Sequence, residues 1–311
     1  MVIKNETKKK VIVLMATYNG ASFVREQLDS ILGQTYENIE IMVRDDGSTD
    51  GTIDILKEYE EKQLIQVTYG ENIGVNKGFF WLIENAKEAD YYSFSDQDDI
   101  WLPEKISRAV ECLDKVDADI PQVYFSDFDF YDAQMNYIRR FPTLTHPHSL
   151  VRVLVGSQLA VGFALVFNAK IKQLIDNAAP FDLKIYGHDH WVTLMGLTLG
   201  DIVYDPVVTA KHRRHAKNVS NYKVNFFDLQ KVRIKSFIIN DEQKVIINSL
   251  FHFYTQYKDA MKKEDREYFE LFINQKYSFK KAVKKCFFSE RYRDKMFDEI
   301  GIRILFLIGK M

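Results

Sequence analysis

The first third of the chain alternates short apolar segments with longer segments whose apolar residues recur every three or four positions. Val11 to Ala16 is apolar and rich in β-branched residues, which is typical of a strand buried on both faces. Ser22 to Leu32 has helical spacing instead. The same alternation predicts strands at 39–43, 65–69 and 91–94 and helices at 52–62 and 79–89. It indicates a mostly parallel sheet flanked by helices.

The pattern is more mixed beyond Pro121 and becomes helical near the end. Further strands are expected at 123–125 and 160–168. From about Phe226, aromatic and aliphatic residues recur at helical spacing among Lys and Glu, and no proline follows Pro206. We therefore expect an α/β domain over residues 1–220, with halves of about 9–120 and 121–220, and a helical C-terminal region over 221–311.

Polar clusters follow three of the predicted strands. They lie at residues 17–19, 45–50 and 96–99. In open α/β sheets, ligands bind beyond the carboxyl ends of the strands. The recurrence of polar clusters at this position predicts a single shared site.

The last of these clusters places Asp96, Asp98 and Asp99 within four residues. Carboxylates this close repel one another unless a cation compensates them, and oxygen ligands suit Mg²⁺ or Mn²⁺. A helix that starts near Pro103 is an alternative and compatible explanation. The loop 45–52 is either a turn with a helix cap or, at the end of a strand in this frame, a nucleotide contact.

Composition and charge exclude some classes of function. The chain has 42 Lys and Arg against 44 Asp and Glu, so its net charge of −2 does not favour binding to nucleic acid. The sequence contains neither a Gly-x-Gly-x-x-Gly nor a P-loop motif, which argues against a dinucleotide oxidoreductase and a P-loop nucleotidase. The two cysteines form neither a disulfide framework nor a zinc motif. No apolar run reaches transmembrane length, so we expect a cytoplasmic protein, with contact to a membrane surface left open.

Four motifs, in this order and spacing, resemble family 2 glycosyltransferases. They are Val13–Gly20, Arg44–Thr52, Asn72–Gly74 and Ser95–Lys105. The stretch Asp-Gln-Asp-Asp-Ile-Trp is especially similar to bacterial rhamnosyltransferase-like members that build surface polysaccharides. The resemblance covers about residues 9–110 strongly and extends less evenly to about 220.

The resemblance implies a GT-A fold, a nucleotide-diphosphate sugar donor, a divalent metal (Mn²⁺ or Mg²⁺) and transfer with inversion. The donor sugar would be rhamnose from dTDP, or another hexose from UDP, and the acceptor a glycan, glycolipid or glycoprotein. The metal ligands it implies are Asp98 first, with Asp99 beside it. The donor-binding residues it implies are Thr17, Tyr18, Asn19, Asp45, Asp46, Asn72 and Asp96.

Two later segments extend this resemblance. Tyr186–Trp191 fits a His-Asp-x-Trp form in which Asp189 is the catalytic base and His188, His190 and Trp191 border the acceptor. The alternative is a solvent loop before a helix with Trp191 in its core. Lys211–Asn218 resembles an Arg-x-His segment, so Arg213 would face the diphosphate and His215 would complete the metal site. The alternative is a basic surface loop.

The segment Gln275–Met311 is basic and rich in apolar residues. A helix of this kind can lie on an anionic membrane or pack on the catalytic domain or on a second subunit. Two rivals to the glycosyltransferase hypothesis remain. One is a metal-dependent sugar nucleotidyltransferase, whose glycine- and lysine-rich phosphate loop is not found after residue 16, and the other is a non-catalytic nucleotide- or carbohydrate-binding protein.

Overall fold

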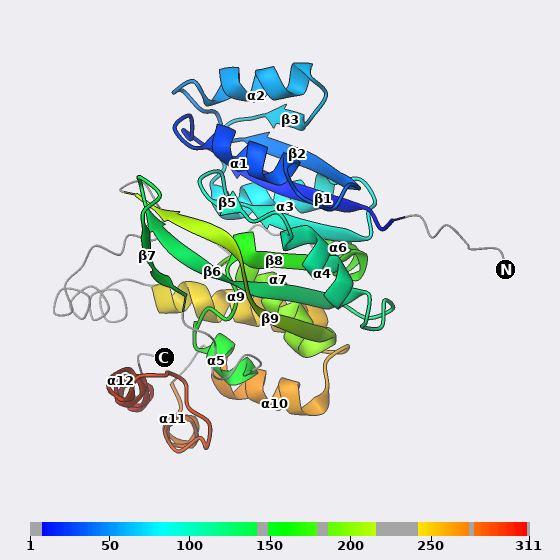
Figure 1. Ribbon diagram of the computed structural model, residues 1–311. Coiled ribbons are helices and arrows are strands. Elements are labelled where there is room, and N and C mark those ends of the chain that lie inside the picture. The colour runs from blue at the N-terminus through cyan, green and yellow to red at the C-terminus, as the bar shows by residue number, and fades with distance from the viewer. Residues whose placement is uncertain (1–7, 142–148, 179–185, 216–241, 274–276, 310–311) are drawn as a thin grey trace. The chain divides into compact units, whose positions relative to one another are not determined.

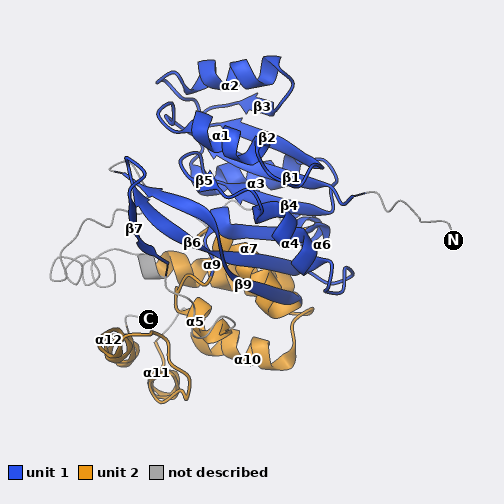
Figure 2. Ribbon diagram, viewed as in Figure 1, with its two compact units in different colours: residues 1–145, 160–177, 200–215 blue, residues 146–159, 178–199, 216–311 orange. Residues whose placement is uncertain are grey.

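The computed structural model describes residues 8–141, 149–178, 186–215, 242–273 and 277–309. These residues form two compact units, which Figure 2 shows in different colours. Unit 1 consists of residues 1–145, 160–177 and 200–215, and unit 2 of residues 146–159, 178–199 and 216–311. The chain therefore passes between the units several times, whereas the sequence predicts one boundary near residue 220.

Unit 1 is built on one sheet with the strand order β3-β2-β1-β4-β8-β6-β9-β5 and with β7 paired to β6 (Figure 1). The strands are β1 Val11–Thr17, β2 Ile39–Asp45, β3 Gln66–Tyr69, β4 Tyr91–Ser95, β5 Ile100–Trp101, β6 Gln122–Asp132, β7 Tyr137–Arg140, β8 Leu165–Asn168 and β9 Asp201–Arg214. The strands β1 to β4 are mutually parallel, as are β6 and β9, whereas β8 is antiparallel to both of its neighbours. The prediction of a mostly parallel α/β sheet is confirmed.

Helices cover both faces of this sheet. Those of unit 1 are α1 Val24–Leu32, α2 Thr52–Glu61, α3 Val75–Asn85, α4 Lys105–Leu113 and α6 Ala169–Asp176, with a 3₁₀ turn at Gly162–Ala164. Val11 and Val13 of β1 share a buried core with residues of α1, α2 and α4. On the other face, Phe79 of α3 packs on Phe94 of β4 with ring centroids 5.2 Å apart. The central strands are therefore apolar on both faces, as the sequence pattern requires.

The strand order creates a switch point between β1 and β4. From β1 the chain moves outward to β2 and β3, and then returns to place β4 on the other side of β1. In open α/β sheets, ligands bind beyond the carboxyl ends of the strands at such a point. The polar clusters that follow β1, β2 and β4 share this edge of the sheet.

The long strand β9 is the main element that the sequence does not predict. It contains Pro206 and a run of polar residues near its end, and both features are unusual in a central strand. Pro206 lies where the pairing with β6 shifts, because Ser126 pairs with Asp205 but Asp127 pairs with Val208. A bulge at this position tolerates proline and lets the strand continue to Arg214.

Unit 2 is helical over the residues that are described. Its helices are α5 Leu150–Leu154, α7 His188–Leu199, α9 Glu242–Tyr257, α10 Lys263–Phe272, α11 Phe279–Cys286 and α12 Met296–Leu307. Phe253 of α9 stacks on Phe269 of α10 with centroids 5.7 Å apart. α5 packs on α7 and α10, which explains why the segments 146–159 and 178–199 group with the C-terminal helices. In the described part of the chain, no helix is both long and apolar enough to cross a membrane.

Candidate active site

Asp45 ends β2 and organises the loop that follows it. The carboxylate accepts hydrogen bonds from the Thr17 hydroxyl (2.8 Å), the Ser48 hydroxyl (2.6 Å) and the backbone N–H groups of Gly47 (3.1 Å) and Ser48 (2.8 Å). Both oxygens are therefore engaged within the protein, and the residue is fully buried. In this structure Asp45 and Thr17 connect the ends of β2 and β1.

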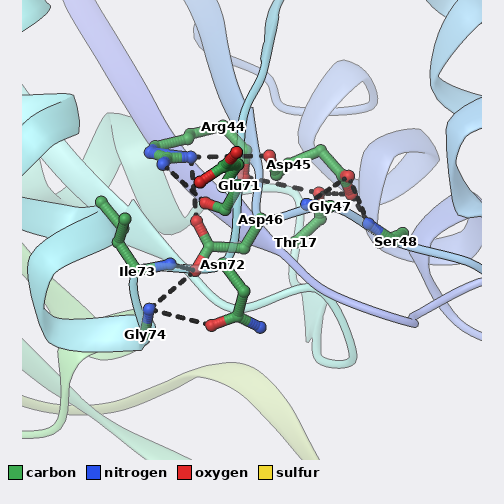
Figure 3. A network of polar contacts seen from close by, with 10 residues as sticks. All are labelled: Thr17, Arg44, Asp45, Asp46, Gly47, Ser48, Glu71, Asn72, Ile73 and Gly74. Atoms are coloured by element: carbon green, nitrogen blue, oxygen red, sulfur yellow. Dashed lines mark hydrogen bonds and ion pairs between the residues drawn. The ribbon is translucent and has the colours of Figure 1, made fainter.

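Asp46 connects the same loop to the segment after β3 (Figure 3). One of its oxygens lies 2.8 Å from the Arg44 guanidinium, and the other accepts the N–H groups of Ile73 (3.1 Å) and Gly74 (3.0 Å). Asn72 reinforces the turn, because its Oδ1 also accepts the N–H of Gly74 at 3.1 Å. Asp46 and Asn72, both predicted to bind the donor, lie together in this network.

The loops after β1 and β4 are joined by a paired amide contact. The side chain of Gln97 accepts the N–H of Tyr18 at 2.9 Å and donates to the Tyr18 carbonyl at 3.0 Å. A Cβ at Gly20 would lie 2.1 Å from Gln97 Oε1, so the pairing depends on this glycine. Asn19 has a positive φ of 50° and accepts the N–H of Thr49 at 2.8 Å. The three predicted polar clusters therefore meet at one edge of the sheet.

The end of β9 brings Arg213 and His215 to the acidic cluster. His215 Nε2 lies 2.8 Å from Asp98 Oδ2, and the imidazole stacks on Phe23 with centroids 4.3 Å apart. Arg213 donates to the Asp98 carbonyl at 3.2 Å, pairs with Glu26 and lies over the Phe23 ring. The sequence predicts that Asp98 and His215 share a site, and the structure brings them together from segments 117 residues apart.

Asp99 has a different environment from Asp98. Its carboxylate is fully buried, and Oδ1 lies 2.7 Å from His212 Nδ1 and accepts the Arg213 N–H at 3.3 Å. The His212 ring stacks on Phe163 with centroids 4.9 Å apart and an interplanar angle of 4°. Asp99 thus connects the acidic loop to β9 through His212.

Both Asp99 and His212 have pKa values that are raised from their ordinary values. Burial raises the pKa of the Asp99 carboxyl, although the adjacent His212 partly opposes the rise. Burial also disfavours the charged form of His212, but the charge and hydrogen bond of Asp99 outweigh burial, so the pKa of His212 is raised.

Asp98 and Asp99, which the resemblance implies as neighbouring metal ligands with His215, lie in different environments. Within the described residues, no group of three or more His, Cys, Asp or Glu side chains is arranged to hold a metal. Asp98 and His215 form a pair, whereas Asp99 is buried against His212. The physical reason is that the loop 96–99 places consecutive side chains in different environments, one in the site and the next in the core.

The predicted base, Asp189, lies in the first turn of α7 in unit 2. Its Oδ2 accepts a hydrogen bond from Gln158 at 2.7 Å, and its Oδ1 accepts the N–H of His190 at 2.8 Å. A carboxylate at the N-terminus of a helix is stabilised by the helix dipole. The side chain is partly exposed.

The structure also corrects the expected role of Trp191. This side chain is fully buried in unit 2 and packs edge-on against Phe253 and Tyr257. It has no free ring face for a sugar, so the alternative of a core tryptophan is the right one. His188 and His190 are also buried, and burial lowers the pKa of His188 to about 4. His190 Nε2 is 3.1 Å from the Val153 carbonyl.

A comparison with protein families supports the resemblance to glycosyltransferases that the sequence motifs indicate. The model of glycosyl transferase family 2 matches residues 12–171. The chain belongs to this family. The match includes the three polar loops at the edge of the sheet.

Three relatives show how far the similarity extends. An uncharacterised glycosyltransferase of Rickettsia felis is 30% identical over 88% of this chain, and the chain spans 44% of that relative. The dTDP-rhamnosyl transferase RfbG of Shigella flexneri is 42% identical over 32% of this chain and 36% of its own. The UDP-Glc:alpha-D-GlcNAc-diphosphoundecaprenol beta-1,3-glucosyltransferase WfaP of Escherichia coli is 31% identical over 39% of this chain and 46% of its own.

The fold also matches a solved structure. S. aureus TarS (residues 1–349) in complex with UDP-GlcNAc gives a TM-score of 0.53 at 18% identity, covering 84% of this chain and 78% of TarS. This similarity concerns the fold, and the prediction of a GT-A glycosyltransferase fold is confirmed.

Sequence reasoning missed three residues at this edge of the sheet. They are Gln97, His212 and Lys105, to which the sequence pattern assigns no role. Lys105 is fully buried, and its ammonium lies 4.8 Å from the Trp101 ring.

Proposed function

We propose that this chain transfers a hexose, with inversion, from a nucleoside diphosphate donor to a hydroxyl of a lipid-linked glycan in the synthesis of a bacterial surface polysaccharide. The observation that carries the proposal is the contact between Asp98 and His215 at the switch point of a family 2 sheet. A carboxylate and an imidazole, beside a buried arginine, are suited to bind a metal and a diphosphate.

The names of two relatives support the choice of substrates. RfbG is a dTDP-rhamnosyl transferase, and WfaP uses UDP-Glc and a diphosphoundecaprenol-linked acceptor. We propose dTDP-rhamnose as the first candidate donor, a UDP-hexose as the second, and a polyprenyl diphosphate-linked sugar as the acceptor.

Asp98 and His215 fit a divalent cation such as Mn²⁺ or Mg²⁺. Both side chains are largely buried and within 2.8 Å of each other, and they offer one oxygen and one nitrogen ligand. Mg²⁺ and Mn²⁺ sites in nucleotide enzymes commonly use one or two protein side chains and complete their coordination with phosphate oxygens and water. When bound, the metal would supply positive charge to the departing diphosphate.

The protein contributes its own cation beside this pair. Arg213 is buried between the Asp98 carbonyl, Glu26 and the Phe23 ring, so its position is fixed before the donor binds. We propose that its positive charge favours the diphosphate in its departing form. A charge held in place needs no reorganisation during the reaction.

Asp189 is proposed as the base that takes the proton from the acceptor hydroxyl. Its two hydrogen bonds, from Gln158 and from the N-terminus of α7, orient the carboxylate and leave lone pairs for the hydroxyl. One general base contributes roughly 10²- to 10⁴-fold. Asp189→Asn should therefore lower kcat by this factor and leave nucleotide affinity unchanged. Asp119→Asn, at an exposed position, is the matched control.

Calorimetry with dTDP, UDP and GDP, each with Mn²⁺, Mg²⁺ or EDTA, tests the donor and metal assignments together. We expect dTDP or UDP to bind tightly only with metal, and Asp98→Asn and His215→Gln to lose the metal-dependent part. Asp54→Asn, on the exposed side of α2, should bind as the parent does. If EDTA leaves the nucleotide affinity of the parent unchanged, and Asp98→Asn binds nucleotide as tightly as the parent does, the metal role is excluded.

A further inference from the structure

Helix α12 has one face that is fixed in unit 2. Ile302 and Phe306 are buried on this face, and the Phe306 ring packs on Tyr292 with centroids 5.1 Å apart. Glu299, also buried, accepts the backbone N–H groups of Tyr292 and Arg293, each at 2.8 Å. These contacts determine which side of the helix faces solvent.

The opposite face of α12, which Ile308 extends beyond the end of the helix, is exposed and consists only of apolar side chains. It consists of Met296, Phe297, Ile300, Ile304, Leu307 and Ile308. The spacing of three and four residues places these side chains along one stripe of the helix. Phe297 is 69% exposed and Ile300 53%. A soluble surface rarely concentrates so many large apolar side chains without a binding function.

Exposed cations accompany this stripe on the neighbouring segment. α11 packs against α12 (Figure 1). It carries the exposed residues Phe279, Lys280 and Lys284, and Phe287 at its end is 81% exposed. The linker between the helices adds two exposed cations, Arg291 and Lys295. Lys285 is the exception, because it is buried between the rings of Phe272 and Phe306.

The two exposed acidic groups of this linker are engaged in contacts of their own. Asp294 lies 2.8 Å from the Arg152 guanidinium, and Glu290 accepts a hydrogen bond from Ser149 at 3.0 Å. The Ser149 hydroxyl leaves the charge of Glu290 in place, but the four exposed cations outnumber the two exposed acidic groups, so positive charge dominates around the stripe. This combination of apolar and cationic side chains is complementary to a layer of acyl chains beneath anionic headgroups.

We propose that the exposed stripe of α12, together with Phe279, Phe287, Lys280 and Lys284, binds the surface of an anionic phospholipid membrane. α12 has 12 residues and is about 18 Å long, so it would lie in the interface and not cross it. A second copy of the chain is a poorer partner, because a two-fold contact would bring the same cations together.

The membrane proposal does not depend on the sugar-transfer proposal. If both hold, the surface brings the enzyme to an acceptor anchored in the lipid. Vesicle binding and nucleotide binding are separate measurements, so either proposal can fail without the other.

The test is co-flotation of the 311-residue chain with vesicles of phosphatidylcholine alone or with about 30% phosphatidylglycerol. We expect binding to the anionic vesicles and little to the zwitterionic ones. The apolar variant is Phe297→Gln, Ile300→Gln, Ile304→Gln, in which glutamine keeps helix propensity. Loss of three apolar contacts should weaken binding by about 100-fold or more.

Matched controls use exposed residues elsewhere. Tyr137→Gln with Ile138→Gln, on β7, removes exposed apolar surface of unit 1 and should not change flotation. Lys280→Gln with Lys284→Gln should weaken it roughly 10- to 30-fold, whereas Lys57→Gln with Lys115→Gln should not.

The proposal fails if the parent chain does not float with anionic vesicles, or if the apolar variant floats as well as the parent while circular dichroism shows both folded. It also fails if sedimentation shows a dimer that the apolar variant abolishes and neither chain binds vesicles, because the stripe would then be an interface between copies.

Discussion

Lys105, in the first turn of α4, is a cation whose burial lowers the stability of the folded chain. Its ammonium has no hydrogen-bond partner among the residues that the structure describes. Burial disfavours the charged form more than the nearby Asp99 favours it, and the pKa of Lys105 is lowered from 10.5 to about 7. We therefore expect Lys105 to destabilise the folded chain at neutral pH.

The magnitude follows from linkage. One pKa unit corresponds to about 1.4 kcal/mol, so a decrease from 10.5 to about 7 costs roughly 5 kcal/mol when Lys105 is charged in both states, below pH 7. Between pH 7 and 10.5 the unfolded chain binds more protons than the folded chain, so stability rises with pH. The cost falls to roughly 3 kcal/mol at pH 8 and roughly 1 kcal/mol at pH 10.

Lys105→Met removes the charge and keeps most of the apolar stem. We expect the variant to be more stable than the parent at pH 6, with a difference that shrinks by about 4 kcal/mol by pH 10. Loss of the cation–π contact with Trp101, worth about 1 kcal/mol, and altered packing would offset part of the gain without removing this trend.

Urea unfolding followed by circular dichroism at pH 6, 8 and 10 measures the difference. Lys115→Met is the control, because the Lys115 side chain is 68% exposed and its loss should change stability little at any pH. A difference between Lys105→Met and the parent that is the same at pH 6 and pH 10 would refute the reasoning, since it would mean that Lys105 does not titrate in the folded state.

Three further predictions concern the site and α12. Gly20→Ala places a methyl group where the Gln97 amide lies, so we expect nucleotide affinity to fall roughly fivefold or more by calorimetry, with unchanged affinity contradicting the role of the pairing. His212→Phe keeps an aromatic ring but deprives Asp99 of its partner, and urea unfolding should show a loss of about 1.5–3 kcal/mol. Gly301→Ala meets nothing within 4 Å, so thermal unfolding should show a gain of about 0.5–1 kcal/mol, and a loss would mean that the exposed side of α12 is occupied.

The half of the chain over about residues 9–120 was predictable because its pattern is local. The run Val11–Ala16 and the helical spacing of Ser22–Leu32 specify their own structure, and β1 and α1 begin and end within two residues of the prediction. Long-range pairing is harder to predict. The strand β9 depends on β6 as its partner and on a bulge at Pro206, and neither is visible in the local pattern.

The same limit explains why the acidic motif could be recognised but its residues could not be assigned. Asp98 and Asp99 are chemically identical neighbours, and only the partner that approaches each one distinguishes them. That partner is β9, whose end carries His212 to Asp99 and His215 to Asp98. His212 and His215 cannot exchange positions, because the His212 ring stacks on Phe163 and the His215 ring stacks on Phe23. The position of β9 in the sheet therefore decides which histidine contacts each aspartate. We expect substitutions at His212 to affect Asp99, and substitutions at His215 to affect Asp98.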